Sequence, residues 1–316
     1  MDERVSGVVM LRAGDCGFGV MLPTFDAFRA GKLPLLDCAE LAEELGFDSG
    51  WVGDHLSFHP PVLDAITALA AAAARTERLV LGTGVLLLPL RHAVWTAKQW
   101  ATLAALAPDR VVLGVGVGGE NPSEWEAAGV SVANRGRRLD ESLEIVGALL
   151  RGEQVNHAGP LLPVRSPALE PFPANRVPLV VGGRSESALR RAARVADGWL
   201  GVWLSVRRLT EIRAELDEYT EQYGRPRCSM LLMVFVHVTD DAAAAQSEVA
   251  TFVQGQYGLP FDKLGRWVLI GDEKHVAAEL AELRATGVEG FVLVPAARDP
   301  LAQYSRLASV RALLDG

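Results

Sequence analysis

The stretch Leu79-Val80-Leu81-Gly82-Thr83-Gly84-Val85-Leu86-Leu87-Leu88 decides the fold class of this 316-residue chain. Apart from two glycines and one threonine, every residue in it is apolar. A strand of a parallel sheet is covered on both faces, so its sequence is apolar throughout instead of alternating. The stretch is too short to cross a membrane, and helical patterns flank it. It therefore predicts a buried strand of a parallel sheet.

Seven further strand-like runs lie on either side of it, at 18–22, 50–53, 111–116, 178–181, 198–202, 229–238 and 290–294. Helical patterns occupy most of the intervening segments, at 34–45, 64–75, 93–106, 137–150, 186–196, 207–223, 240–254 and 274–286, whereas 154–173 is a proline-rich loop. Eight strand–helix units in about 300 residues predict a single α/β domain, a (β/α)8 TIM barrel. We expect one domain over 1–316, with 1–16 as an N-terminal extension. A doubly wound open sheet is the alternative.

Composition limits the partners of the chain. Its net charge is −8, which argues against nucleic acid and anionic membrane surfaces as partners, because both require a basic face. Three dispersed cysteines, Cys16, Cys38 and Cys228, predict neither a disulfide framework nor a cysteine metal site. Residues 1–17 lack the pattern of a signal peptide, and no apolar stretch has the length of a membrane span. We expect a cytoplasmic protein that acts on a small-molecule substrate.

Ionisable side chains follow two of the predicted strands, where barrel active sites lie. Asp54 and His55 follow the second strand, and Glu120 follows the fourth. A histidine suits proton transfer near neutral pH, Asp54 could fix its tautomer, and Glu120 is a candidate acid. The alternative is a hydrogen-bonded structural histidine. His55 and His59 are four residues apart, but Pro60-Pro61 follow and no third ligand is evident, so we expect no metal site.

Two glycine-rich turns follow later strands. The run 114–119 has the form GxGxxG, but a dinucleotide site would need a helix opening on those glycines and an acidic residue at a strand end, whereas Asp140 falls within a predicted helix. These glycines could instead let the backbone approach a flat ligand. The run 182–185 lies between a strand and a helix, where free N–H groups and an arginine can bind phosphate. A simple tight turn with Ser185 as the N-cap is the alternative.

Taken together, these strand ends resemble the bacterial luciferase-like superfamily of flavin- and deazaflavin-dependent oxidoreductases. The resemblance runs in order from Phe18 to Val294 and so covers nearly all of the chain. The matching segments are Gly50-Trp51-Val52-Gly53-Asp54-His55, Leu81-Gly82-Thr83-Gly84-Val85, Leu113-Gly114-Val115-Gly116-Val117-Gly118, Val181-Gly182-Gly183-Arg184-Ser185 and Ala196-Asp197-Gly198-Trp199. Each segment alone is weak, but five in register are specific.

The resemblance implies a ring cofactor at the mouth of the barrel. It implies a non-proline cis peptide at Gly84–Val85 that supports one face of the ring, and a cofactor phosphate bound by the loop 182–185. The cofactor-binding residues implied in this way are Asp54, Gly84, Val85, Gly118, Gly182, Gly183, Arg184 and Ser185.

The residues after the second and fourth strands resemble those of the branch that uses the deazaflavin coenzyme F-420 (F420). That branch implies hydride transfer to or from a small organic substrate, with His55 as the base and Glu120 as the acid. Its glucose-phosphate dehydrogenases carry a tryptophan four residues after the histidine, where this chain has His59, which argues against a sugar-phosphate substrate.

Two other functions remain open within the same resemblance. The first is a monooxygenase that uses reduced FMN supplied by a flavin reductase. The second is a non-catalytic barrel that binds flavin, although Gly84, Gly182 and Gly183 are all present. The family usually dimerises through helices beside the early strands, and the segments 65–74 and 95–106 would suit a homodimer, although packing in the core would explain them equally well.

Overall fold

Eight parallel strands close into a barrel in the computed structural model, which describes residues 17–119 and 121–316. Their order around the barrel is β1 (Phe18–Met21), β2 (Ser49–Val52), β3 (Val80–Thr83), β4 (Val111–Val115), β7 (Leu179–Gly182), β8 (Gly198–Val202), β9 (Ser229–Val238) and β11 (Gly290–Pro295). Strand β11 pairs with β1 in parallel, which closes the ring. The predicted TIM barrel is therefore confirmed, and the open-sheet alternative is wrong.

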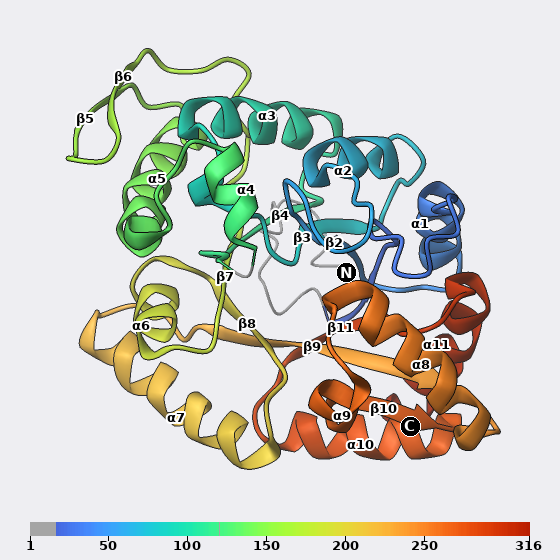
Figure 1. Cartoon of the computed structure of the whole chain (residues 1–316). Helices are drawn as coiled ribbons and strands as arrows, with labels where there is room; N and C mark the ends of the chain where they lie inside the picture. Colours follow the sequence, from blue (N-terminus) through green and yellow to red (C-terminus); the bar gives the residue numbers. More distant parts are fainter. Residues whose placement is uncertain (1–16, 120) are drawn as a thin grey trace, which may run out of the picture.

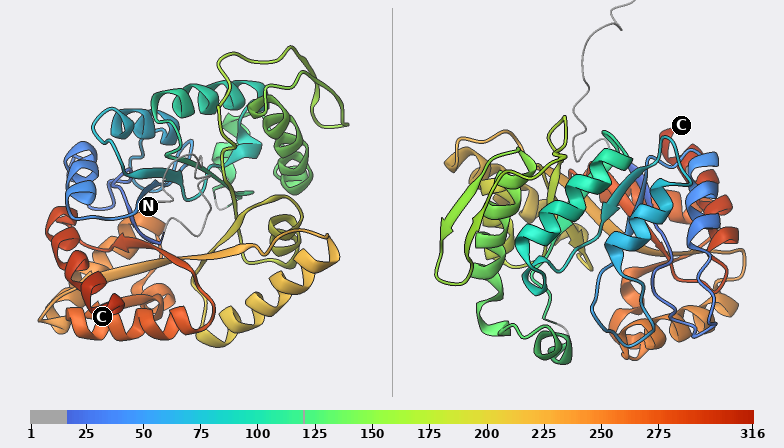
Figure 2. Two further views of the ribbon diagram at one scale, coloured as in Figure 1. Left: turned by 180° about the vertical axis from the view of Figure 1, so that it is seen from behind. Right: turned by 90° about the horizontal axis from the view of Figure 1, so that it is seen from above.

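An outer ring of helices covers the barrel (Figures 1 and 2). It consists of α1 (Leu35–Glu44), α2 (Ala65–Ala73), α3 (Ala93–Leu106), α5 (Arg135–Leu150), α6 (Glu186–Val195), α7 (Val206–Gln222), α10 (Glu273–Ala285) and α11 (Pro300–Asp315). Side-chain caps begin several of them. The Asp64 carboxylate accepts the Thr67 N–H at the start of α2, and the Ser185 hydroxyl accepts the Ala188 N–H at the start of α6. These caps end the loops that leave β2 and β7.

Several short elements decorate this frame that the sequence pattern did not predict. They are α4 (Pro122–Ala127), the hairpin of β5 (Val155–Ala158) and β6 (Pro163–Ser166), α9 (Phe261–Leu264), β10 (Val268–Gly271), and the 3₁₀ turns η2 (Leu88–Leu90), η3 (Val132–Asn134) and η4 (Gly265–Trp267). The hairpin lies in the segment expected to be a loop, outside α3 and α5 (Figure 1). Strand β10 pairs with the second half of β9, which extends beyond the end of β8.

The barrel interior is filled with side chains. The Trp51 ring is fully buried there, with Val80, Val112, Val180, Leu200, Leu231 and Val292 in the same cluster. A Cβ atom at Gly82 would lie 2.6 Å from the Trp51 ring, so β3 needs glycine at this position. Since the interior is packed, a ligand can bind only at an end of the barrel.

Candidate active site

A cavity of about 340 Å³ opens at the carboxyl ends of the strands. Residues in each strand of the barrel or just beyond its end line the cavity, and examples from four strand ends are Met21, Gly84, Gly182 and Met233. The volume lies within the range typical of small-molecule sites. The strand ends that the sequence singled out therefore meet around one cavity.

One side of the cavity is built from glycines at the ends of β3, β4 and β7, which are neighbours in the barrel. The Gly84–Val85 peptide is cis, as the resemblance implied. The Val85 side chain lies between two glycines, since an added Cβ would be 2.4 Å from it at Gly116 and 2.7 Å at Gly182. We call Gly84, Val85, Gly116, Gly182 and Gly183 the glycine wall. Because this wall consists of backbone and one small side chain, no bulky side chain projects from it into the cavity.

The loop after β7 continues this wall. Gly183 has a φ of +130°, which favours glycine, and its carbonyl accepts the Trp199 Nε1–H at 2.7 Å. Gly182, Gly183 and Arg184 line the cavity, and the Arg184 side chain is exposed. The Ser185 hydroxyl caps α6, so the tight-turn interpretation also describes this loop. An N-cap and an anion site are compatible, because the cap binds one N–H of the helix terminus and leaves others for a ligand.

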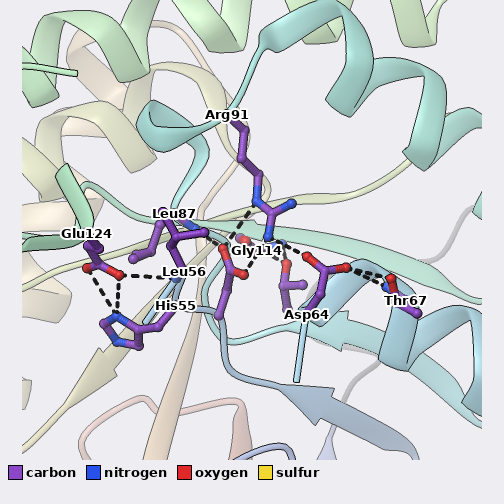
Figure 3. Close-up of polar contacts among 10 residues, drawn as sticks. His55, Leu56, Asp64, Thr67, Leu87, Arg91, Gly114 and Glu124 are labelled. Carbon is purple, nitrogen blue, oxygen red and sulfur yellow. Dashed lines mark hydrogen bonds and ion pairs between the residues drawn. The ribbon is translucent and has the colours of Figure 1, made fainter. Parts of the chain in front are cut away.

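His55 pairs with a buried carboxylate on α4 (Figure 3). Its Nδ1 lies 3.1 and 3.2 Å from the two oxygens of Glu124, whose side chain is fully buried. Glu124 also accepts the Leu56 N–H, so one carboxylate holds both the imidazole and the backbone after β2. Glu120, the acid suggested by the sequence, lies outside the described residues.

Sequence reasoning missed Glu124, although a signal for its helix was present. Asn121 followed by Pro122 is a common helix start, and the Asn121 side chain does cap α4 by accepting the Ser123 N–H. The resulting turn directs Glu124 toward the end of β2. Only the packing of α4 against that strand end, which is a long-range contact, brings the two side chains together.

Asp54 joins the loops after β2 and β3 through its contacts with Leu87 and Arg91. Its carboxylate is buried, accepts the Leu87 N–H at 2.9 Å and pairs with Arg91 at 2.6 Å. Arg91 also pairs with Asp64, the N-cap of α2. Burial alone would lower the pKa of Arg91, but the two carboxylates more than offset it and raise that pKa. Asp54 lines the cavity, yet its oxygens hold the backbone just beyond Val85.

The opposite side of the cavity carries aromatic rings. We call Phe25, Phe28, Phe58, Trp203, Phe235 and Tyr257 the aromatic wall; all six line the cavity. They follow or belong to β1, β2, β8, β9 and α8 (Ala242–Tyr257), the part of the ring that does not carry the glycines. Trp203 has a φ of +56°, which is uncommon for a residue with a large side chain. Backbone conformations of this kind are found mainly at functional sites.

Cys38 and Cys228 are buried and do not line this cavity. Burial raises the pKa of the Cys38 and Cys228 thiols to about 12, so neither is a nucleophile at neutral pH. Residues 17–119 and 121–316 hold no group of three His, Cys, Asp or Glu side chains able to bind a metal. No helix in these segments is long and apolar enough to cross a membrane.

Comparison with solved structures supports the fold. An F420-dependent secondary alcohol dehydrogenase, solved with an F420–acetone adduct, superimposes with a TM-score of 0.83 at 18% identity, covering 95% of this chain and 99% of that one. The monooxygenase RslO1 from Streptomyces bottropensis gives a TM-score of 0.81 at 20% identity, covering 94% and 98%. At such low identity these likenesses concern the fold alone.

Sequence comparison gives nearer relatives. An F420-dependent glucose-6-phosphate dehydrogenase of Microbacterium testaceum is 37% identical over 182 residues, 54% of this chain and 52% of that protein, so the match spans about half of its length. The enzyme of the same name from Beutenbergia cavernae is 37% identical over 235 residues, 71% of this chain and 69% of that protein. The family model described as luciferase-like monooxygenase matches residues 18–290. The chain belongs to the luciferase-like monooxygenase family.

Proposed function

We propose that this protein is an oxidoreductase that binds the deazaflavin F420 and acts on a small organic substrate. One observation carries the proposal: the glycine wall and the His55–Glu124 pair line or adjoin the same cavity. The names of the relatives from Microbacterium testaceum and Beutenbergia cavernae support F420 as the cofactor. The deazaflavin supplies a carrier for hydride that reacts poorly with oxygen.

The glycine wall fits a flat ring. At Gly116 and Gly182 a Cβ atom would collide with Val85, so side chains there would displace the residue that forms the floor of this side of the cavity. The loop 182–185 would hold the phosphate, with backbone N–H groups at the start of α6 and the exposed Arg184 guanidinium. Asp54 would act indirectly by fixing the backbone beyond Val85.

His55 would handle the proton. The Glu124 carboxylate accepts hydrogen bonds only, so it fixes the proton of the neutral imidazole on Nδ1 and leaves the lone pair on Nε2. Nε2 then takes a proton from the substrate or returns it, and the carboxylate stabilises the imidazolium that forms. Glu120 stays a prediction as the second proton-handling group.

Use of FMN with a separate flavin reductase is the second candidate. The aromatic wall favours it, because a site for reduced flavin must keep water away. We distinguish the two by titrating the purified chain with F420 and with FMN and following the quenching of cofactor fluorescence. We expect F420 to bind at least tenfold more tightly. Tight binding of FMN without binding of F420 would overturn the choice.

We propose a homodimer that forms through α2 and α3. On α3 the side chains of Trp95 and Leu106 are 68% and 63% exposed, which is unusual for residues of this size and polarity. Light scattering coupled to size exclusion should give twice the chain mass, and Trp95→Lys should shift it toward the monomer. A monomeric native chain would contradict the proposal.

A further inference from the structure

The two walls of the cavity have different chemistry, and the aromatic wall indicates the kind of substrate. We propose that the substrate is uncharged, has an aromatic or alicyclic body that packs on the aromatic wall, and carries a hydroxyl group that binds Gln256 and Thr24. This inference rests on the proposed function, because it assigns the glycine wall to the cofactor and the aromatic wall to the substrate.

Four rings of the aromatic wall contact one another in a row that begins at the proton-handling residue. The His55 imidazole stacks on Phe58 with 4.0 Å between ring centres, and Phe58 meets Tyr257 edge-on at 6.1 Å. Tyr257 contacts Trp203 at 5.2 Å, and Trp203 stacks on Phe235 at 6.0 Å. An apolar ring laid on this surface would gain both buried area and aromatic contacts. Its reacting carbon could still lie beside His55.

Two buried polar atoms lie among these rings without a partner. Gln256 is 6% exposed and Thr24 is fully buried, and both residues line the cavity. Within the described chain, Gln256 Oε1 and Thr24 Oγ1 have no hydrogen-bond partner. A buried polar atom without a partner is destabilising, so such atoms indicate a bound group.

The two residues belong to segments that are packed together. Gly255 on α8 lies against the loop after β1, since a Cβ there would be 1.9 Å from the Ala27 carbonyl oxygen. Thr24 belongs to the same loop, and Gln256 follows Gly255. A hydroxyl group donates one hydrogen bond and accepts others, so it can serve the amide of Gln256 and the hydroxyl of Thr24.

Among the described residues no buried lysine or arginine lines the cavity, so a phosphorylated substrate at the aromatic wall would meet cations only at the exposed rim. The cations in its lining, Lys32, Arg184 and Arg298, all have exposed side chains at the rim. The guanidinium of Arg298 lies over Phe28 at 4.7 Å, and that of Arg184 over Trp203 at 5.6 Å. The buried Asp26 carboxylate accepts the N–H groups of Ala30 and Gly31 and adds a negative charge to this side.

Calorimetric titration tests this inference with two probes that differ by one hydroxyl, 4-ethylphenol and ethylbenzene, and with glucose 6-phosphate for comparison. The full chain is titrated with and without F420. We expect 4-ethylphenol to bind most tightly, ethylbenzene less tightly and glucose 6-phosphate not measurably. Tighter binding of glucose 6-phosphate than of 4-ethylphenol would overturn the proposal.

Variants assign the hydroxyl contact. Gln256→Leu should weaken 4-ethylphenol about 5- to 10-fold, the effect of one buried hydrogen bond, and change ethylbenzene less than twofold. The matched control is Gln254→Leu, an exposed glutamine on the same helix, which should change neither. Thr24→Val, of nearly equal volume, is the second variant and should also weaken only 4-ethylphenol.

Unchanged binding of 4-ethylphenol in both Gln256→Leu and Thr24→Val would contradict the contact. The result is separable from the cofactor proposal. Failure of F420 to bind the native chain would contradict the proposed function. Binding of F420 without a preference for 4-ethylphenol over the other two probes would contradict this inference alone.

Discussion

The glycine wall and the aromatic wall face each other across one cavity, yet they are built in different ways. The glycine wall lies at the strand ends themselves, and buried contacts hold it: Asp54 binds the backbone of Leu87, and Trp199 binds that of Gly183. The aromatic wall consists of side chains, and five of its six members lie on loops or on α8. The barrel geometry therefore fixes one side, whereas the other can change with the loops.

This difference suggests that the glycine wall binds the cofactor and the aromatic wall binds the substrate. A wall made of backbone cannot change its shape without changing the barrel, which suits a cofactor common to many relatives. A wall made of loop side chains can be altered one residue at a time, which suits a substrate that differs between relatives. The following predictions test whether the two walls are independent.

The largest effect should come from a charge on the glycine wall. Gly183→Asp should lower the affinity for F420 or FMN at least 100-fold, because it places a carboxylate where phosphate is proposed to bind. Gly183→Asn has the same shape and the same strain at a φ of +130° but no charge, so it serves as the control. Fluorescence titration measures both. Equal losses in the two variants would refute the phosphate assignment.

Loss of the Asp54–Arg91 ion pair behind the glycine wall should have a smaller effect, which is measured as a change in the free energy of unfolding. Arg91→Met leaves the buried Asp54 carboxylate without its cation and should lower the free energy of unfolding by about 2–4 kcal/mol. Arg75→Met breaks the exposed pair with Glu40 and should lower the free energy of unfolding far less, because solvent screens that pair. Urea denaturation compares the two. A loss at Arg91 no larger than that at Arg75 would show that the pair does not support this wall.

The His55–Glu124 pair should affect catalysis without affecting cofactor binding. Glu124→Gln should lower kcat about 10-fold and leave KM and the F420 affinity within twofold, because the amide holds the imidazole but no longer stabilises its charge. Nitrogen-15 NMR of His55 should also lose the single tautomer with the proton on Nδ1. Glu126→Gln, an exposed carboxylate on the same helix, is the control and should change nothing. An unaltered kcat and tautomer would remove Glu124 from the mechanism.

Much of the glycine wall could be predicted from the sequence. The apolar run 79–88 indicates a strand with both faces buried; the glycines at 84 and 116 lie within predicted strands, and those at 182 and 183 directly follow one. The position of Asp54 was also visible in this way. Its role was not, because the contacts with Leu87 and Arg91 depend on how two loops meet in space.

The aromatic wall and the partner of His55 could not be predicted. Phe58, Trp203 and Tyr257 come from three distant segments, and a single aromatic residue in a loop does not reveal which rings it will meet. Glu124 was passed over for the same reason. Strand β10 was not predicted, because a run of four residues resembles a loop unless it is known that β9 is long enough to pair with it.

The most direct test of the division between the walls is a cross of two variants against two ligands. Calorimetry would give the dissociation constants of F420 and of 4-ethylphenol for the native chain, for Gly183→Asp and for Phe25→Leu, a ring of the aromatic wall that contacts His55 and Phe58. We predict that Gly183→Asp loses F420 at least 100-fold and keeps 4-ethylphenol within twofold, and that Phe25→Leu weakens 4-ethylphenol about tenfold and keeps F420 within twofold. Equal losses of both ligands in either variant would contradict the account.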